Sequence, residues 1–270
     1  NQITKDEQTQ DKLASISSEI KTVLILQEIP FVISFHDRVQ IFHQLLKKER
    51  QIHQSDGYHF GLPGSAITVQ IRRNYIYEDA FEELSFDNEP NMKLPLKVSL
   101  INTVGAEEAG IDGGGLTKEF LCELLKTGFD PMRGFFKYTK DHFLYPNPSA
   151  NVLFSTSPEG YEIHYEFLGR MLGKAIFEKI MVELPLASFF LAKLLAVKHS
   201  SDVDLHNLES LDPVLYKNLV YLKNYKGDVA DLNLDFTISN NELGEHEMVE
   251  LKPNGSKIPV TRENKIEYVH

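Results

Sequence analysis

The cysteine and histidine side chains are the first candidates for chemistry in this chain. Cys122 is the single cysteine, and a cysteine nucleophile needs a base or a positive charge beside its thiol. Its neighbours are instead Leu121, Leu125, Glu119 and Glu123, and carboxylates oppose ionisation of a thiol. We therefore expect a small core residue. The ten histidines follow no metal-binding spacing and no carboxylate pair reads as an acid/base couple, so we predict neither a catalytic residue nor a metal site.

A glycine-rich loop over residues 110–115 precedes a predicted helix, and backbone amides at such a position can bind phosphate. The phosphate-loop pattern requires Lys and Ser or Thr directly after the last glycine, where Leu116 and Thr117 stand. The dinucleotide pattern fails too, because no glycine follows Gly115 at the third position. We expect no nucleotide cofactor here. The glycines are expected to permit a tight turn, with Gly113 or Gly114 in a conformation that a Cβ would strain.

Composition excludes several classes of protein. The chain has 270 residues, 42% of them hydrophobic, and a formal net charge of −11. Its acidic pI near 5.4 argues against nucleic acid as a partner, and one cysteine excludes a disulfide framework. The most apolar stretch, residues 184–197, contains Pro185 and Lys193 and is shorter than the ~20 residues of a membrane span. We expect an acidic cytoplasmic or nuclear protein with no membrane partner.

Helices and short strands alternate in the predicted organisation. Ser34 is expected to cap a helix that carries one apolar stripe. Two strands are predicted from alternating residues over 67–71 and 96–100, with a short helix over 79–84 between them. Residues 116–197 are expected to be mainly helical, with breaks at Gly128, at Pro131 and across 145–157. Loops or linkers are expected at 54–65, 88–91 and 199–204.

The predicted helix over 165–179 contains Gly169 and Gly173. Such a spacing is a dimerisation face in lipid, but the charged residues of this segment indicate a soluble helix. We expect the two glycines to permit close helix packing in the core. The rest of the expected buried face consists of Leu168, Leu172, Ala175 and Ile176.

The segment over 211–227 is delimited as a helix by Asp212 as N-cap, Pro213 at the first position and Gly227 past the end. It carries two apolar lines: Leu215, Leu219 and Leu222 form one, and Val214 and Tyr221 form the other. Apolar lines are usually buried, so periodicity alone favours core for both. A short helix in a small subdomain has little core to cover two lines, however, and one of them would then serve a protein partner.

Several sequence blocks resemble the N-lobe of HECT-type ubiquitin ligases. They lie in the family's order between about residues 31 and 270, and residues 73–80 and 110–115 are most similar to the proteasome-associated branch. The blocks are Ile71-Arg-Arg73 with Glu78-Asp79, Asp112-Gly-Gly-Gly115 with Lys118-Glu-Phe120, Leu168-Gly-Arg-Met-Leu-Gly-Lys174, and Ile258-Pro-Val-Thr261 with Asn264 and Tyr268.

The resemblance implies a lobe that recruits a ubiquitin-charged conjugating enzyme. Ubiquitin would pass through a C-lobe cysteine to substrate lysines by covalent catalysis. No residue here matches that cysteine, so we expect the C-lobe to be absent and this piece to be inactive alone. Ubiquitin, protein substrates and the proteasome are further expected partners. A noncatalytic interaction module on the same scaffold is the alternative.

The resemblance also implies a fold and a docking site. The fold would be α+β and mainly helical, with a peripheral segment over 1–30, a large subdomain over 31–197 and 245–270, and a small inserted subdomain over 198–244. Periodicity alone assigns the first apolar line of the helix over 211–227 to the core. The resemblance implies instead that this line belongs to a groove for the conjugating enzyme. Its expected residues are Leu215, Leu219, Leu222, Tyr225, Leu232, Leu234 and Tyr268.

Overall fold

The computed structural model describes residues 21–54, 66–85, 91–108, 114–156, 160–195, 204–240 and 247–270. The chain divides into two compact units. The first contains residues 1–67, 91–95 and 177–179, and the second contains 68–90, 96–176 and 180–270. The loops or linkers expected at 54–65, 88–91 and 199–204 lie almost entirely outside the described residues.

The first unit contains helix α2 (Phe35–Gln54), which follows a 3₁₀ turn, η1 (Pro30–Val32). Ser34 caps α2 as predicted, because its hydroxyl oxygen accepts a hydrogen bond from the Asp37 amide at 3.2 Å and donates to the Asp37 carboxylate at 2.6 Å. Near the other end of the helix, the Lys93 ammonium pairs with Glu49 at 3.1 Å. This pair connects residues 91–95 with α2 inside the same unit.

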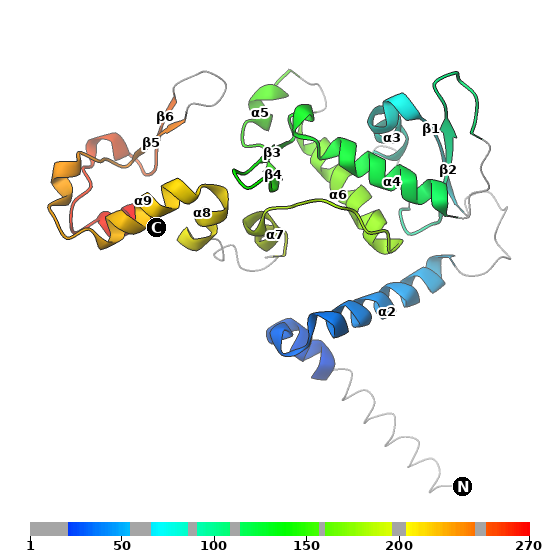
Figure 1. The fold of residues 1–270 in the computed structure, drawn as a ribbon, viewed down its shortest axis with the longest axis horizontal. Coiled ribbons are helices and arrows are strands. Elements are labelled where there is room, and N and C mark those ends of the chain that lie inside the picture. The colour runs from blue at the N-terminus through cyan, green and yellow to red at the C-terminus, as the bar shows by residue number, and fades with distance from the viewer. Residues whose placement is uncertain are drawn as a thin grey trace, which may run out of the picture. The chain divides into compact units, whose positions relative to one another are not determined.

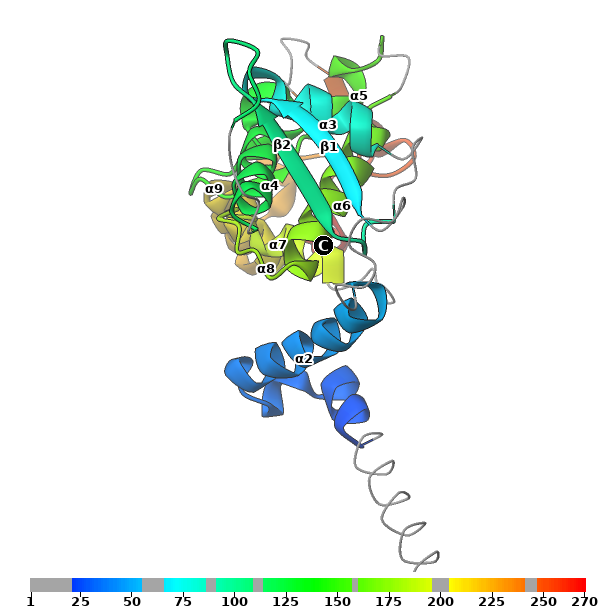
Figure 2. The same cartoon turned by 90° about the vertical axis from the view of Figure 1, so that its right-hand side faces the viewer.

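The two predicted strands are confirmed as β1 (Ile67–Arg72) and β2 (Leu96–Ile101), which form a two-stranded sheet. Figure 2 shows the two strands side by side with helix α4 (Gly115–Gly128) next to β2. Of the alternating apolar side chains only Ile67 is half-buried and the others are buried. The Thr117 hydroxyl of α4 donates to the Leu96 carbonyl oxygen at 3.0 Å. Period-two alternation thus produced one buried face, as sheet geometry requires.

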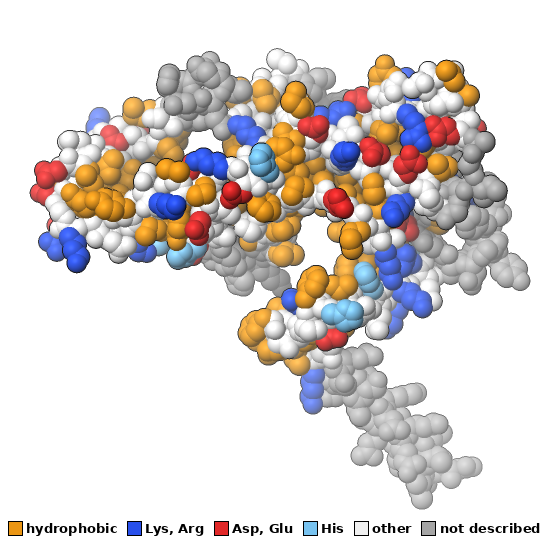
Figure 3. Space-filling view, viewed as in Figure 1, with side chains coloured by type: hydrophobic (Ala, Val, Ile, Leu, Met, Phe, Trp, Pro, Cys, Tyr) orange, Lys and Arg blue, Asp and Glu red, His pale blue; other side chains and the backbone are white. Residues whose placement is uncertain are grey.

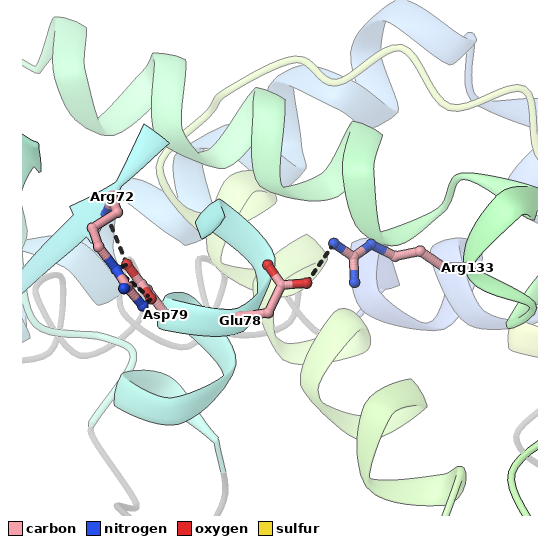
Figure 4. Close-up of polar contacts among 4 residues, drawn as sticks. All are labelled: Arg72, Glu78, Asp79 and Arg133. Atoms are coloured by element: carbon pink, nitrogen blue, oxygen red, sulfur yellow. Dashed lines mark hydrogen bonds and ion pairs between the residues drawn. The ribbon is translucent and has the colours of Figure 1, made fainter. Parts of the chain in front are cut away.

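Helix α3 (Ile76–Leu84) begins three residues before its predicted start, after the 3₁₀ turn η2 (Arg73–Tyr75). Asp79 of α3 is almost fully buried and accepts hydrogen bonds from the Arg72 backbone amide at 2.8 Å and from the Arg72 guanidinium. One residue earlier, Glu78 pairs with Arg133 at 2.9 Å. Figure 4 shows that the two carboxylates hold α3 to residues on either side of it.

An aromatic cluster joins α3 to helix α6 (Glu162–Phe177). The Tyr77 hydroxyl lies 3.0 Å from Nδ1 of His164, and the rings of Phe81 and Phe135 lie 4.3 Å and 4.7 Å from the His164 ring. Burial raises the pKa of the Tyr77 phenol above its ordinary value. The hydrogen bond satisfies polar groups that this apolar environment would otherwise leave unpaired.

The stretch over 116–197 is less helical than predicted. Helix α4 ends at Gly128 as expected, and the 3₁₀ turn η4 (Pro131–Arg133) follows. The expected helix across Phe136–Leu144 is wrong: β3 (Phe136–Tyr138) and β4 (Leu144–Pro146) form an antiparallel hairpin, with Lys137 opposite Tyr145. Helix α5 (Ala150–Leu153) comes next.

The expectation of close packing at the glycines of α6 is also wrong. Gly169 and Gly173 are exposed, and a Cβ at either would meet nothing within 4 Å. Of the expected buried face, Leu168 and Ala175 are buried, whereas Leu172 is half-buried and Ile176 is 44% exposed. The buried face instead includes Phe167 and Met171. Helix α7 (Ser188–Leu195) follows α6.

The last part of the chain forms a separate core cluster. Its elements are α8 (Leu205–Leu211), α9 (Pro213–Asn224), η5 (Val229–Leu232), β5 (Thr237–Asn240), β6 (Glu247–Glu250), η7 (Gly255–Lys257) and α10 (Lys265–Val269). Helix α8 was not predicted. The buried members are Leu205, Leu222, Val229, Phe236, Val260 and Val269.

Residues 247–270 pack with this cluster. Residues 245–270 are expected in the large subdomain, whereas in the structure β6 pairs with β5, and Asp235 forms a β-bridge with Pro259. Val260 and Val269 are therefore buried in the same core cluster as Leu205 of α8 and Leu222 of α9. In the described residues the fold is mixed α+β and mainly helical, as predicted (Figure 1). Their helices are too short or too polar to cross a bilayer.

Candidate functional site

Helix α9 begins at a well-defined cap. The Asp212 carboxylate accepts hydrogen bonds from the amides of Val214 at 3.0 Å and Leu215 at 3.1 Å, and Pro213 occupies the first helical position. The Lys140 ammonium also pairs with Asp212 at 2.8 Å. Lys140 and the helix amides hold the pKa of Asp212 below its ordinary value. The predicted cap is thus confirmed, and it fixes where the apolar face of α9 starts.

Of the seven predicted site residues, one lies in the last core cluster and four pack against it. Leu222 belongs to the buried core with 5% of its surface exposed. Leu215 and Leu232 are each 37% exposed. The other four, which are partly buried and pack against the cluster, are Leu219, Tyr225, Leu234 and Tyr268.

The second apolar line of α9 is more exposed than the first. Val214 is 57% exposed and Tyr221 is 65% exposed. The Tyr221 ring lies 5.7 Å from the Tyr225 ring, so the second line adjoins the predicted site. Figure 3 shows exposed hydrophobic side chains, with Lys or Arg side chains between them, over the part of the molecule that holds α9. The helix therefore presents apolar surface to solvent, and most of it lies on the line with Val214.

Tyr268 reaches the cluster from α10. Its ring meets the Phe236 ring edge to face, with 5.3 Å between the centroids. Burial, and then the Asp235 carboxylate, raise the pKa of the Tyr268 phenol. On the other side, Lys252 lies 3.6 Å from the Phe236 centroid and pairs with Glu267 at 2.8 Å. These contacts give Tyr268 a fixed place beside the core.

A cavity of about 290 Å³ lies against α9. Leu219 is the one predicted site residue among its described lining residues, so the cavity and the exposed residues of the site are different surfaces. The lining also includes Phe189, Leu205, Leu208, Leu211 and Val269.

The chemistry of the seven side chains is that of binding. They are aliphatic or phenolic, without a carboxylate, amine, imidazole or thiol. The single thiol, Cys122, lies on α4 and is half-buried rather than in the core as predicted, because Leu121 and Leu125 occupy the buried face. Its Sγ lies 3.9 Å from the Met181 carbonyl oxygen. In the described ranges, no three His, Cys, Asp or Glu residues are grouped as a metal site would require.

Two residues that contact the site were not singled out as site residues. The Lys265 ammonium donates a hydrogen bond to the Tyr225 carbonyl oxygen at 2.8 Å. Gly227, predicted only as a helix terminator, lies against the Tyr225 ring. The presence of Lys265 three residues before Tyr268 does not by itself predict a contact with Tyr225. That contact depends on how α10 packs on α9, and no local sequence pattern predicts this packing.

Comparison with known proteins gives one consistent family. The sequence profile of the HECT-domain (ubiquitin-transferase) family matches residues 122–270. The chain is 43% identical to E3 ubiquitin-protein ligase UPL6 of Arabidopsis thaliana, over 91% of this chain and 23% of that protein. It is 41% identical to human ubiquitin-protein ligase E3B, over 92% of this chain and 23% of that protein. It is 35% identical to E3 ubiquitin-protein ligase HUL5 of Saccharomyces cerevisiae, over 94% of this chain and 28% of that protein. The chain spans about a quarter of these relatives.

Proposed function

This chain belongs to the HECT-domain family of ubiquitin transferases, and we propose that it recruits a ubiquitin-charged conjugating enzyme through the apolar surface around α9. The surface consists of the predicted residues other than Leu222, which belongs to the core, with Val214 and Tyr221 beside them. In a ubiquitin ligase, docking at this surface would bring the charged enzyme to the cysteine that receives ubiquitin. The proposal does not assign that role to Cys122, the single cysteine of this chain.

The observation that carries the proposal is the gradient of burial within the seven residues. Leu222 belongs to the core cluster, which serves as the floor. Leu219, Tyr225, Leu234 and Tyr268 pack half-buried against this cluster, and Leu215 and Leu232 are exposed. Apolar side chains that are exposed next to a well-packed floor are typical of interface anchor sites. A purely structural stripe would bury Leu215 and Leu232 as well.

The proposal includes a subdomain division. The core cluster of 205–240 and 247–270 would form a small subdomain that carries the docking surface, and 68–85, 96–176 and 180–195 would form the scaffold. Hydrogen bonds between described residues of the two groups include Lys140 to Asp212 at 2.8 Å and Ser188 to Ser210 at 3.3 Å. Phe189 also lines the cavity together with Leu205 and Leu208, so apolar side chains of both groups meet there.

The experiment is a titration of this chain with a panel of purified ubiquitin-conjugating enzymes, uncharged and charged with ubiquitin, followed by fluorescence anisotropy or calorimetry. A docking partner that must leave after each transfer is expected to bind with a Kd in the micromolar range. Leu215→Ala and Leu232→Ala should each weaken that binding about 5- to 30-fold.

The matched control is Leu153→Ala. Leu153 is 46% exposed, at the end of α5, so its loss removes a similar amount of accessible apolar surface elsewhere. Its substitution should leave the Kd unchanged. The proposed docking surface would be overturned if Leu153→Ala weakened binding while Leu215→Ala and Leu232→Ala left it intact.

A further inference from the structure

Tyr225 is the C-cap of α9, directly after its last residue Asn224, and its side chain is half-buried against the core cluster. We propose that Gly227 and Lys265 are positioning residues for Tyr225: they hold its ring in the place where it forms one wall of the docking surface. The inference rests on the proposed function and adds to it the two residues that set the shape of the surface without themselves belonging to it.

Gly227 provides the space in which the Tyr225 ring lies. A Cβ built on Gly227 would be 2.6 Å from Oη, 2.7 Å from Cζ and 2.9 Å from Cε1 of Tyr225. Carbon atoms do not approach one another this closely, so any other residue at this position would displace the ring. The displaced atoms are the far end of one side chain, and Gly227 itself is exposed. The ring can therefore move while the core remains packed.

Lys265 holds the same residue through its backbone. Its ammonium donates to the Tyr225 carbonyl oxygen at 2.8 Å. The last carbonyl groups of a helix have no partner within the helix, and a cation is favourable at this negative end. The contact thus satisfies an acceptor next to the C-terminus of α9 and fixes the direction in which the chain leaves the helix.

Lys265 also relates Tyr225 to Tyr268. Lys265 is the first residue of α10, and Tyr268 lies one turn later on the same short helix. The two aromatic residues are 43 positions apart in the chain, so no local structure determines their separation. The hydrogen bond from Lys265 joins the start of α10 to the end of α9, and a second contact, 3.0 Å between the Lys223 ammonium and Nε2 of His270, joins α9 to the other end of α10. A partner side chain that enters between the rings would meet walls whose spacing depends on these contacts.

The test measures the Kd of the tightest-binding conjugating enzyme from the panel for Gly227→Ala, Lys265→Met and Lys265→Arg. Each is made in the wild-type chain and in the Tyr225→Ala chain, so that a double-mutant cycle isolates effects transmitted through the ring. Gly115→Ala and Lys118→Met are the controls: Gly115 has open space around it, and Lys118 is exposed on α4. Thermal unfolding of every variant is recorded in parallel.

We expect Gly227→Ala to weaken binding about 5- to 10-fold at an unchanged unfolding temperature, and to have no effect once Tyr225 is alanine. Lys265→Met should weaken binding similarly, and Lys265→Arg should restore it because a guanidinium can donate to the same carbonyl oxygen. Full affinity of Gly227→Ala, or an equal loss in the Tyr225→Ala chain, would overturn the inference. If Leu215→Ala weakens binding while Tyr225→Ala does not, the positioning role fails and the docking surface stands. If neither weakens binding, the proposed function itself fails.

Discussion

Leu215 and Leu222 lie seven residues apart on the same face of α9, yet the exposed fraction falls from 37% at Leu215 to 5% at Leu222. Two turns of helix separate a leucine that solvent reaches from one that the core encloses. Stability depends on the buried side chain, whereas a partner can contact only the accessible one. Substitution by alanine should therefore lower mainly the stability at Leu222 and mainly the affinity for the partner at Leu215.

Leu222→Ala should lower the free energy of unfolding by about 2–5 kcal/mol, because it leaves a cavity in the cluster. Leu215→Ala should lower it by less than about 1 kcal/mol, since solvent already reaches this side chain. Urea denaturation followed by circular dichroism measures both values. Equal losses of unfolding free energy in the two variants would contradict the assignment of Leu222 to the core and of Leu215 to the docking surface.

Local patterns predicted the parts of the fold whose residues interact with near neighbours. The strands β1 and β2 can be predicted from their alternating residues, and the start of α9 can be predicted from Asp212. Neither prediction requires a contact with a distant part of the chain. Helix α8 was missed although Asp204 and Asn207 form a capping box, because the helix is short. The hairpin of β3 and β4 was missed because each strand has three residues, too few for a period to show.

The candidate site was predicted as a set of residues, but their depth was not. Whether Leu215 or Leu222 is exposed depends on how η5 and α10 cover α9, and these elements come from later parts of the chain. The same non-local packing brings 247–270 to the small core through the pairing of β5 with β6. Periodicity describes one element at a time and cannot supply this information.

The backbone at Gly114 predicts a cost for any side chain there. Its φ of +92° lies in the left-handed region at the N-cap of α4, and a Cβ would meet no atom within 4 Å. Gly114→Val should therefore lower the free energy of unfolding by about 1–3 kcal/mol through backbone strain alone. Gly115→Ala, with open space and no positive φ, should cause no loss. Equal stability of Gly114→Val and wild type would contradict the strain.

The pairing of Asp79 with Arg72 predicts a pH dependence. The Arg72 guanidinium, and then its backbone amide, hold the pKa of Asp79 below its ordinary value. A carboxyl with a depressed folded-state pKa stabilises the protein above its unfolded pKa of about 3.9, and this stabilisation is lost as pH falls through the folded value. Asp79→Asn should thus be less stable than wild type at pH 7.

The difference in unfolding free energy between wild type and Asp79→Asn should shrink as the pH falls below about 5 and through the lowered folded-state pKa of Asp79. Urea denaturation at several pH values measures it, with Asp141→Asn as the exposed control. A difference that does not vary with pH would show that the Asp79 charge contributes nothing to the pairing.

Cys122 predicts the outcome of a transfer assay on this chain. It is half-buried on α4, and its contact with the Met181 carbonyl oxygen supplies neither the base nor the cation that activates a thiol. Incubation with activating enzyme, charged conjugating enzyme and ubiquitin should give no thioester on this chain. A ubiquitin adduct that dithiothreitol removes and that is lost in Cys122→Ser would assign the chain a nucleophile of its own.

The most direct test of the docking surface is methyl NMR of the leucines in this chain during titration with the conjugating enzyme. Leu215, Leu232 and Leu234 should shift or broaden in proportion to complex formed, because partner atoms would approach them. Leu153, exposed on α5, and Leu124, buried in α4, should remain unchanged. Perturbation confined to Leu153 or to the leucines of α4 and α6, with Leu215 and Leu232 unaffected at saturation, would contradict the proposal that this surface recruits the conjugating enzyme.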